Sequence, residues 1–256
     1  MTIKREKEKL RGVQLLPNLL TTGSLFGGFY SIVATLQGSF EKAAIAIIIS
    51  IFFDGIDGKV ARITRTESRF GVEYDSLSDL IAFGVAPSIL VYSWALTPFG
   101  RLGWLAGFVY TACVALRLAR YNVQFYTVES KHFRGLPCPA AAGSVASTVL
   151  LYFHLGGEGN FSRQIALLLV VYLLGGLMVS NIPYYGFKEF DLLRRKPFGI
   201  LFLMVLILAL VVAFPPVTLF IMGVVYVSSG PVLYFFKRKR AVPDKSESLE
   251  SKKLGF

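Results

Sequence analysis

Four aspartates in the first third of the chain have the residue type and the spacing expected of metal ligands. Asp54 and Asp57 are three residues apart and therefore share one face of a helix. Asp75 and Asp79 are four residues apart and share a face of the next helix. A short connection separates the two segments, so we expect antiparallel neighbours whose four carboxylates converge. Converging carboxylates repel one another in a poorly solvated site, and one or two divalent cations remove that repulsion.

These residue types indicate which metal ions and which kind of ligand the site can bind. Carboxylate oxygens suit Mg²⁺, Mn²⁺ or Ca²⁺ rather than zinc, and we expect Mg²⁺ or Mn²⁺, as two ions. Gly58 and Ala61 leave room for a substrate on the aspartate side, and Arg62 can hold a phosphate as a fork-shaped donor. Gly71 permits close approach at the start of the next helix. Metal ions and an arginine around a diphosphate indicate phosphoryl transfer.

A simpler explanation exists for charged residues near helix ends in an apolar chain. Single Asp or Arg side chains often extend from a membrane helix to the water interface. That explanation covers one such residue well. It does not cover four aspartates in helical register with two glycines and an arginine, and we favour a functional site.

The elements that position these residues are expected to be membrane helices. The chain has 256 residues, of which 54% are hydrophobic and 17% charged, with a mean hydropathy of +0.58. A soluble domain has about 25% charged residues. Eight apolar segments approach the roughly 17–25 residues that cross a bilayer. They begin near Leu15, Phe40, Phe70, Leu102, Leu136, Gln164, Phe198 and Pro216.

The predicted fold is therefore all-α: a polytopic membrane helix bundle of about eight transmembrane helices over residues 1–236. We expect the polar, basic tail at 237–256 to be disordered. With both termini in the cytoplasm, only Lys42, Arg101 and Arg163 of the 27 Lys and Arg fall on the outer side. We therefore expect a protein integral to the cell (inner) membrane, with its active site facing the cytoplasm. The net charge of +11 is explained by this topology, and nucleic acid is not an expected partner.

The pattern around the aspartates resembles the signature of the CDP-alcohol phosphatidyltransferases. It reads Asp54-x2-Asp57-Gly58-x2-Ala61-Arg62-x8-Gly71-x3-Asp75-x3-Asp79, and each fixed position and spacing matches. The resemblance implies a membrane helix bundle in which Asp54, Asp57 and Asp75 hold metal ions and Asp79 lies against one of them. It also implies that Asp79 is the general base and that Gly58 and Arg62 serve the nucleotide and diphosphate.

Four further segments resemble the integral-membrane phosphatidylserine synthases within that family. They are residues 16–29, 116–123, 133–143 and 178–188, with Ser24 standing where we expect an asparagine. The resemblance implies CDP-diacylglycerol as the donor, L-serine as the acceptor and CMP as a product. It also implies that Asn18 and Thr21 contact the nucleotide, although capping of a helix start explains them equally well.

The acceptor site is expected near the end of the fourth span. Serine carries a carboxylate and an ammonium group, and Arg117 and Arg120, three residues apart, can bind a carboxylate beside Asn122. Alternatively, the two arginines only anchor the helix end at the membrane. Cys113 and Cys138 have no metal-ligand or redox spacing, so we expect both to be small, buried apolar residues.

Other functions remain open from the residues alone. The same phosphatidyl transfer is possible with glycerol 3-phosphate or an inositol phosphate as the acceptor. A protein of another class, a membrane cation transporter, would also use four aspartates, but near the bilayer midplane. Small residues at 140–142 and 175–176 suit close helix packing or a homodimer contact, and membrane lipids are expected partners.

Overall fold

The computed structural model describes residues 2–64, 68–127, 135–159, 165–184 and 197–240. Its α-helices are α1 (Thr2–Leu36), α2 (Phe40–Thr64), α3 (Arg69–Asp79), α4 (Ala86–Val91), α5 (Arg101–Thr127), α6 (Cys138–His154), α7 (Ile165–Val179), α9 (Pro197–Ala213) and α10 (Pro215–Arg240). The π-helical turn η1 (Leu80–Val85) joins α3 to α4. The π-helical turn η2 (Tyr92–Leu96) and the 3₁₀ turn η3 (Thr97–Phe99) follow α4, so that one rod runs from Arg69 to Phe99. No β-strand occurs in these ranges, and the predicted all-α class is confirmed.

Seven of the eight predicted starts lie within two residues of the start of a described helix, whereas α1 begins at Thr2, 13 residues before Leu15. Within the described ranges, four stretches are long and apolar enough to cross a membrane: Leu16–Leu36, Arg69–Phe99, Arg101–Val123 and Pro215–Tyr234. The remaining segments are shorter or more polar. Helices α6, α7 and α9 have 17, 15 and 17 residues, and α2 carries the first aspartate pair. The chain is thus a helical membrane protein, and the count of eight spans stays a prediction.

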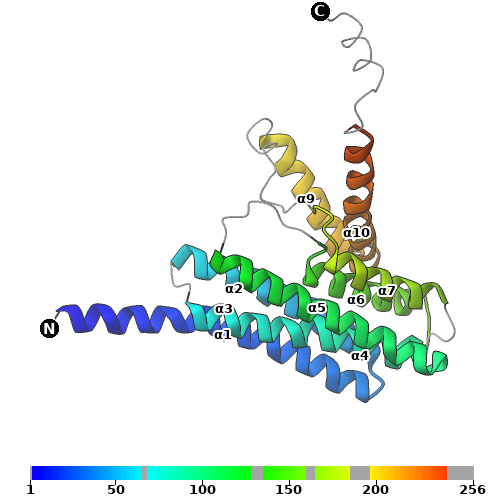
Figure 1. The fold of residues 1–256 in the computed structure, drawn as a ribbon, viewed down its shortest axis with the longest axis horizontal. Coiled ribbons are helices and arrows are strands. Elements are labelled where there is room, and N and C mark those ends of the chain that lie inside the picture. The colour runs from blue at the N-terminus through cyan, green and yellow to red at the C-terminus, as the bar shows by residue number, and fades with distance from the viewer. Residues whose placement is uncertain (1, 65–67, 128–134, 160–164, 185–196, 241–256) are drawn as a thin grey trace, which may run out of the picture.

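The helices α1 to α7 lie along one axis and form a bundle, with α1 beside α2 and α5 beside α7 (Figure 1). Helices α9 and α10 stand steeply to that axis, and α10 packs on α6 (Figure 1). Helix α10 continues to Arg240, so residues 237–240, which we assigned to the tail, are helical; residues 241–256 lie outside the described part.

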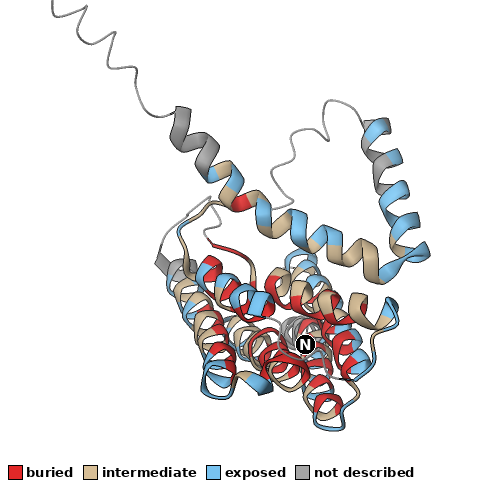
Figure 2. Cartoon of the chain, turned by 90° about the vertical axis from the view of Figure 1, so that its right-hand side faces the viewer, coloured by how far each residue is buried: buried red, intermediate tan, exposed pale blue. Residues whose placement is uncertain are grey.

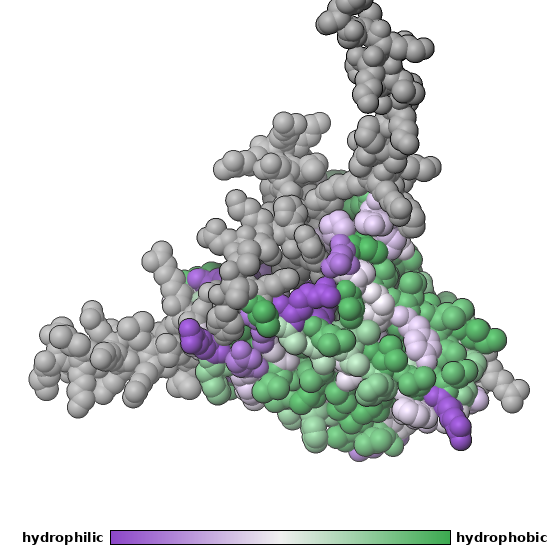
Figure 3. Space-filling view, viewed as in Figure 1, coloured by the Kyte–Doolittle hydropathy of each residue, from purple (hydrophilic) through white to green (hydrophobic). Residues whose placement is uncertain are grey.

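Buried residues gather on the inward faces of the bundle, as the view down its axis shows (Figure 2). Trp94, Tyr110, Phe83 and Ile47 are its largest buried side chains. On the outer surface, apolar side chains cover most of the visible face, while hydrophilic side chains gather toward the end from which α1 extends (Figure 3). An apolar outer surface is what a helix bundle presents to lipid.

Glycines let α1 approach its neighbours closely. A Cβ atom at Gly28 would lie 2.6 Å from Cα of Ala82 in η1, a distance that two carbon atoms do not tolerate. Beside it, the hydroxyl of Ser50 on α2 donates a hydrogen bond to the backbone oxygen of Ser24 at 3.0 Å. Small residues that permit backbone contact are typical of helix packing in membranes. At Gly175 on α7, a Cβ atom would lie 3.4 Å from Sγ of Cys113 on α5, which is an ordinary van der Waals contact.

Replacing Gly28 by alanine is expected to destabilise the bundle, because the added methyl group overpacks the contact with η1 by about 1–3 kcal/mol. The matched control is Gly176→Ala on α7, where an added Cβ meets no atom within 4 Å. There the substitution is expected to be neutral or to stabilise by about 0.5–1 kcal/mol through helix propensity. Apparent Tm in detergent measures both. Equal Tm values for the two variants would contradict the close α1–η1 contact.

Candidate active site

Three of the four aspartates, two from α2 and one from α3, form a compact group beside α1, which packs against both helices. Each of Asp54, Asp57 and Asp75 offers a carboxylate oxygen, and these oxygens all lie within 4.8 Å of one another. Asp57 is buried, and the other two are partly exposed. Helix α3 begins next to this group, where the hydroxyl of Ser68 accepts a hydrogen bond from the backbone N–H of Gly71 at 3.0 Å.

Asp79 lies one turn further along α3, behind the group of three. It interacts electrostatically with Asp54 and Asp75. Its Oδ1 atom is buried and has no hydrogen-bond partner among the described residues. A buried carboxylate oxygen without a partner is costly and calls for a cation or a donor. Three converging carboxylates and this fourth oxygen are hard oxygen ligands that fit Mg²⁺ or Mn²⁺.

Helix α1 fixes the position of the buried aspartate. The Thr21 hydroxyl donates to Oδ2 of Asp57 at 2.8 Å and lies 3.1 Å from the backbone oxygen of Pro17. From α3, the Ser78 hydroxyl donates to the backbone oxygen of Thr21 at 3.1 Å. Thr21 is itself buried, and its hydrogen bond orients the carboxylate of Asp57. Its contact with a nucleotide stays a prediction.

The other predicted nucleotide and diphosphate residues border the same site. A Cβ atom at Gly58 would meet nothing within 4 Å, so the α2 backbone there is open to a ligand. At Gly71 a Cβ would lie 3.5 Å from Oδ1 of Asn18, which places these two residues side by side. Ala61 is partly exposed and Arg62 is exposed on the continuation of α2. The structure thus places Asn18 beside Gly71, and Gly58, Ala61 and Arg62 follow Asp57 on α2; their contact with a nucleotide or diphosphate stays a prediction.

An aromatic pair on α3 adds a contact that the sequence did not indicate. Tyr74 stacks on Phe70 with ring centroids 5.9 Å apart, and its hydroxyl lies 2.9 Å from the hydroxyl of Thr22 on α1. The contact joins residues 52 positions apart, and only the packing of α1 against α3 brings Tyr74 to Thr22.

The three predicted acceptor residues on α5 have three different sets of partners. Arg117 donates from Nη1 to Sγ of Cys138, 3.4 Å away, and Cys138 interacts electrostatically with Asp54 and Asp79. Arg117, on α5, is thus linked to the group of aspartates through Cys138, the first residue of α6. Cys138 is buried as expected, but it is a polar contact of the site as well as an apolar residue; Cys113 is only partly buried.

Arg120 and Asn122 point to other elements. Arg120 donates from Nη1 to the backbone oxygen of Val179 at 3.2 Å and to Oδ1 of Asn181 at 3.5 Å, beyond the end of α7. Asn122 accepts from the Ser76 hydroxyl at 3.1 Å and donates to Oε2 of Glu73 at 3.2 Å. Asn122 is therefore oriented by the helix that carries Asp75. The three residues do not form one clamp, and their binding of an acceptor stays a prediction.

Comparison with known proteins assigns the chain to a protein family. A model of the CDP-alcohol phosphatidyltransferase family matches residues 14–180. The CDP-diacylglycerol–serine O-phosphatidyltransferase of Helicobacter pylori is 40% identical over 238 residues, which are 91% of this chain and 97% of that protein. The enzyme of the same name from Bacillus subtilis is 33% identical, over 68% of this chain and 92% of its own. The archaetidylserine synthase of Methanothermobacter thermautotrophicus is 38% identical over 69% of this chain and 72% of its own.

The hydrogen bond from Thr21 to Asp57 can be tested by metal binding. Thr21→Val keeps the shape of the side chain and removes its hydroxyl, so Asp57 loses its partner. We expect Mn²⁺ affinity to fall by about 10-fold or more, as for other groups that orient a metal ligand. The measurement is a Mn²⁺ titration of purified protein followed by electron paramagnetic resonance. The control is Thr35→Val, whose hydroxyl bonds only the Ser31 backbone oxygen in the described part. Unchanged affinity in Thr21→Val would contradict the orienting role.

Proposed function

Because the chain belongs to the CDP-alcohol phosphatidyltransferase family, we propose that it transfers the phosphatidyl group of CDP-diacylglycerol to L-serine. The products are phosphatidylserine and CMP. The observation that carries this proposal is the group of three carboxylates within 4.8 Å, with Asp79 beside it, at the family's signature positions. The choice of serine is supported by relatives up to 40% identical that are named for serine transfer.

The site has a place for each part of the donor. Asp54, Asp57 and Asp75 are the residues that would hold Mg²⁺ or Mn²⁺, as two ions, and Asp79 adds an oxygen. When bound, the ions would offset charge on the diphosphate and on the departing CMP. Around them, the nucleotide and diphosphate would contact Asn18, Thr21, Gly58, Ala61, Arg62 and Gly71. The open space over Gly58 supports this placement.

The acceptor is activated by a carboxylate and oriented by α5. Asp79 takes the proton from the serine hydroxyl, and the serine oxygen forms a bond to the lipid-side phosphorus. The bond from that phosphorus to the CMP oxygen breaks, and CMP leaves with the electron pair. Arg117 binds the serine carboxylate, supported by its approach to the site through Cys138. Asn122, held by Ser76 and Glu73, would contact the acceptor from the side of α3, and Arg120 would do so separately, from the end of α7.

A cation transporter would require a different placement of the carboxylates. Asp75 and Asp79 lie in the first third of the rod Arg69–Phe99, and the α2 pair lies in the second half of its helix. The group is thus near one end of the bundle rather than at its middle. This position supports an enzyme whose water-soluble substrates arrive from one side.

The membrane arrangement is also part of the proposal. Eight spans with both termini in the cytoplasm place the carboxylate end at the cytoplasmic face of the inner membrane, in agreement with the positions of Lys and Arg. This topology requires α9 and α10 to align with the bundle in the membrane. A homodimer is proposed as the assembled state.

The decisive measurement is release of CMP from CDP-diacylglycerol by purified protein in detergent. We expect release that requires L-serine and Mg²⁺ or Mn²⁺ and that stops when a chelator is added. Parallel reactions receive glycerol 3-phosphate, inositol phosphate or no acceptor. Release that requires glycerol 3-phosphate or inositol phosphate instead of serine would overturn the serine assignment, but it would still support phosphatidyl transfer. No release from folded protein with any acceptor would overturn both.

Replacing the proposed base isolates its role. Asp79→Asn keeps the size of the side chain and removes its ability to accept a proton, so we expect kcat to fall by about 10²–10⁴-fold. The control is Glu41→Gln, which removes an exposed carboxylate at the far end of α2. Circular dichroism and Mn²⁺ titration check that Asp79→Asn is folded and retains metal. Near-normal kcat in that protein would exclude Asp79 as the base.

A further inference from the structure

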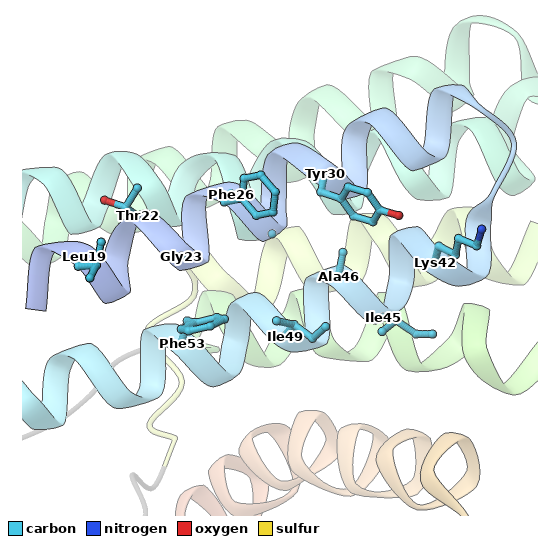
Figure 4. Close-up of a pocket in the computed structure, with 11 residues that line it drawn as sticks. Leu19, Thr22, Gly23, Phe26, Tyr30, Lys42, Ile45, Ala46, Ile49 and Phe53 are labelled. Atoms are coloured by element: carbon cyan, nitrogen blue, oxygen red, sulfur yellow. The ribbon is translucent and has the colours of Figure 1, made fainter. Parts of the chain in front are cut away.

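An open apolar groove of about 690 Å³ runs between α1 and α2 (Figure 4). Its walls include Leu19, Phe26, Ile45, Ile49 and Phe53. Phe26 is 69% exposed, Ile49 47% and Ile45 43%, so these side chains border the groove without filling it. Gly23 deepens it, because its missing side chain makes room beside the ring of Phe53. The shape is that of a channel open on one side, with almost wholly apolar walls.

One end of the groove lies next to the candidate active site along both α1 and α2. On α2, Phe53 directly precedes Asp54 and lies four residues, about one helical turn, before Asp57. On α1, Thr22 lines the groove and follows Thr21, the partner of Asp57. Thr22 also contacts Tyr74 of the helix that carries Asp75. The mouth of the groove is therefore bordered by both aspartate-bearing helices.

The other end of the groove lies near the connection between α1 and α2, at Tyr30 and Lys42. Along α2, the 11 residues from Phe53 to Lys42 span about 16 Å at about 1.5 Å per residue. An extended hydrocarbon chain advances about 1.3 Å per carbon, given a C–C bond near 1.5 Å. The groove thus has the length of about twelve carbons. A lipid whose head group is at the carboxylates would reach Lys42 only with a long chain.

We propose that this groove binds one acyl chain of the CDP-linked donor lipid and so contributes to donor-chain selectivity. The proposal rests on the proposed function, because the head group must sit at the aspartates for the chain to enter beside Phe53. The first carbons of this acyl chain lie against Phe53 and Gly23. Its middle carbons lie against Ile49 and Phe26, and its later carbons against Ile45. Carbons beyond the length of the groove leave it through its open side into the surrounding lipid.

The test places a bulky side chain at two depths and compares donors of two chain lengths. Ile45 lies about 12 Å beyond Phe53 and Ile49 about 6 Å, at about 1.5 Å per residue. An eight-carbon chain, about 10 Å long when extended, ends before Ile45 but passes Ile49. We therefore expect Ile45→Trp to raise KM for dioleoyl donor on the order of tenfold while KM for dioctanoyl donor stays within about twofold. Ile49→Trp is expected to raise KM for both donors.

The matched control is Leu173→Trp, which adds the same bulk at an apolar position of α7 that is 56% exposed and outside the groove. It is expected to leave both KM values unchanged. The proposal is overturned if Ile45→Trp shifts the two donors equally, if neither groove variant has an effect, or if Leu173→Trp matches them.

A binding measurement separates failure of this proposal from failure of the proposed function, since it needs no acceptor. CDP-diacylglycerol with a photoreactive diazirine in one acyl chain is irradiated with the protein in detergent. We expect labelling within residues 19–30 and 42–53 that unlabelled CDP-diacylglycerol removes and an equal amount of phosphatidylcholine does not. Labelling that both lipids remove equally would assign the groove to bulk lipid and overturn the proposal. Absence of label in these two segments would also overturn it.

Discussion

Electrostatic repulsion among aspartates is the constraint on which the rest of this structure depends. Carboxylate oxygens from α2 and α3 lie within 4.8 Å of one another in a helical membrane protein, where few water molecules offset their charge. Such a group is tolerable only if the fold supplies donors and leaves a place for cations. Both are present, because Thr21 donates to Asp57 while Oδ1 of Asp79 has no partner among the described residues.

The packing of α1 meets this constraint in two ways. Gly28 allows α1 to contact η1, immediately after Asp79, at backbone distance. This close approach brings Thr21 to Asp57 and Ser78 to the backbone of Thr21. Without a hydrophobic driving force between helices in lipid, such small-residue contacts and hydrogen bonds determine how helices associate. On its other side, α1 borders the groove with α2, so one helix takes part in both the metal-ligand support and the proposed lipid contact (Figure 4).

Segments that are far apart in the chain meet around the end of α5. Arg120 bonds the backbone of Val179 and the side chain of Asn181, and Gly135 donates its N–H to the backbone oxygen of Ile182 at 2.9 Å. Gly135 has a φ of +82°, and a Cβ there would collide with the backbone of Met178, so glycine is required. The described parts of three segments that resemble phosphatidylserine synthases, residues 116–123, 135–143 and 178–184, are therefore in contact with one another, although Arg120 and Val179 are 59 residues apart in sequence.

The sequence by itself determined the helical class, the approximate starts of the helices and the family, because hydropathy and motif spacing are local properties of the chain. It also indicated that Asp54 and Asp57 share a face, since helical periodicity alone places them there. Only the tertiary structure decided that Asp57 pairs with Thr21, that Arg117, Arg120 and Asn122 have separate partners, and that α9 and α10 stand steeply to the bundle. These features depend on contacts between helices that are distant in sequence, and hydropathy does not encode which faces meet. A pattern of residues therefore predicted which chemistry is possible, whereas the packing of α1, α5 and α6 selected the partners of each side chain.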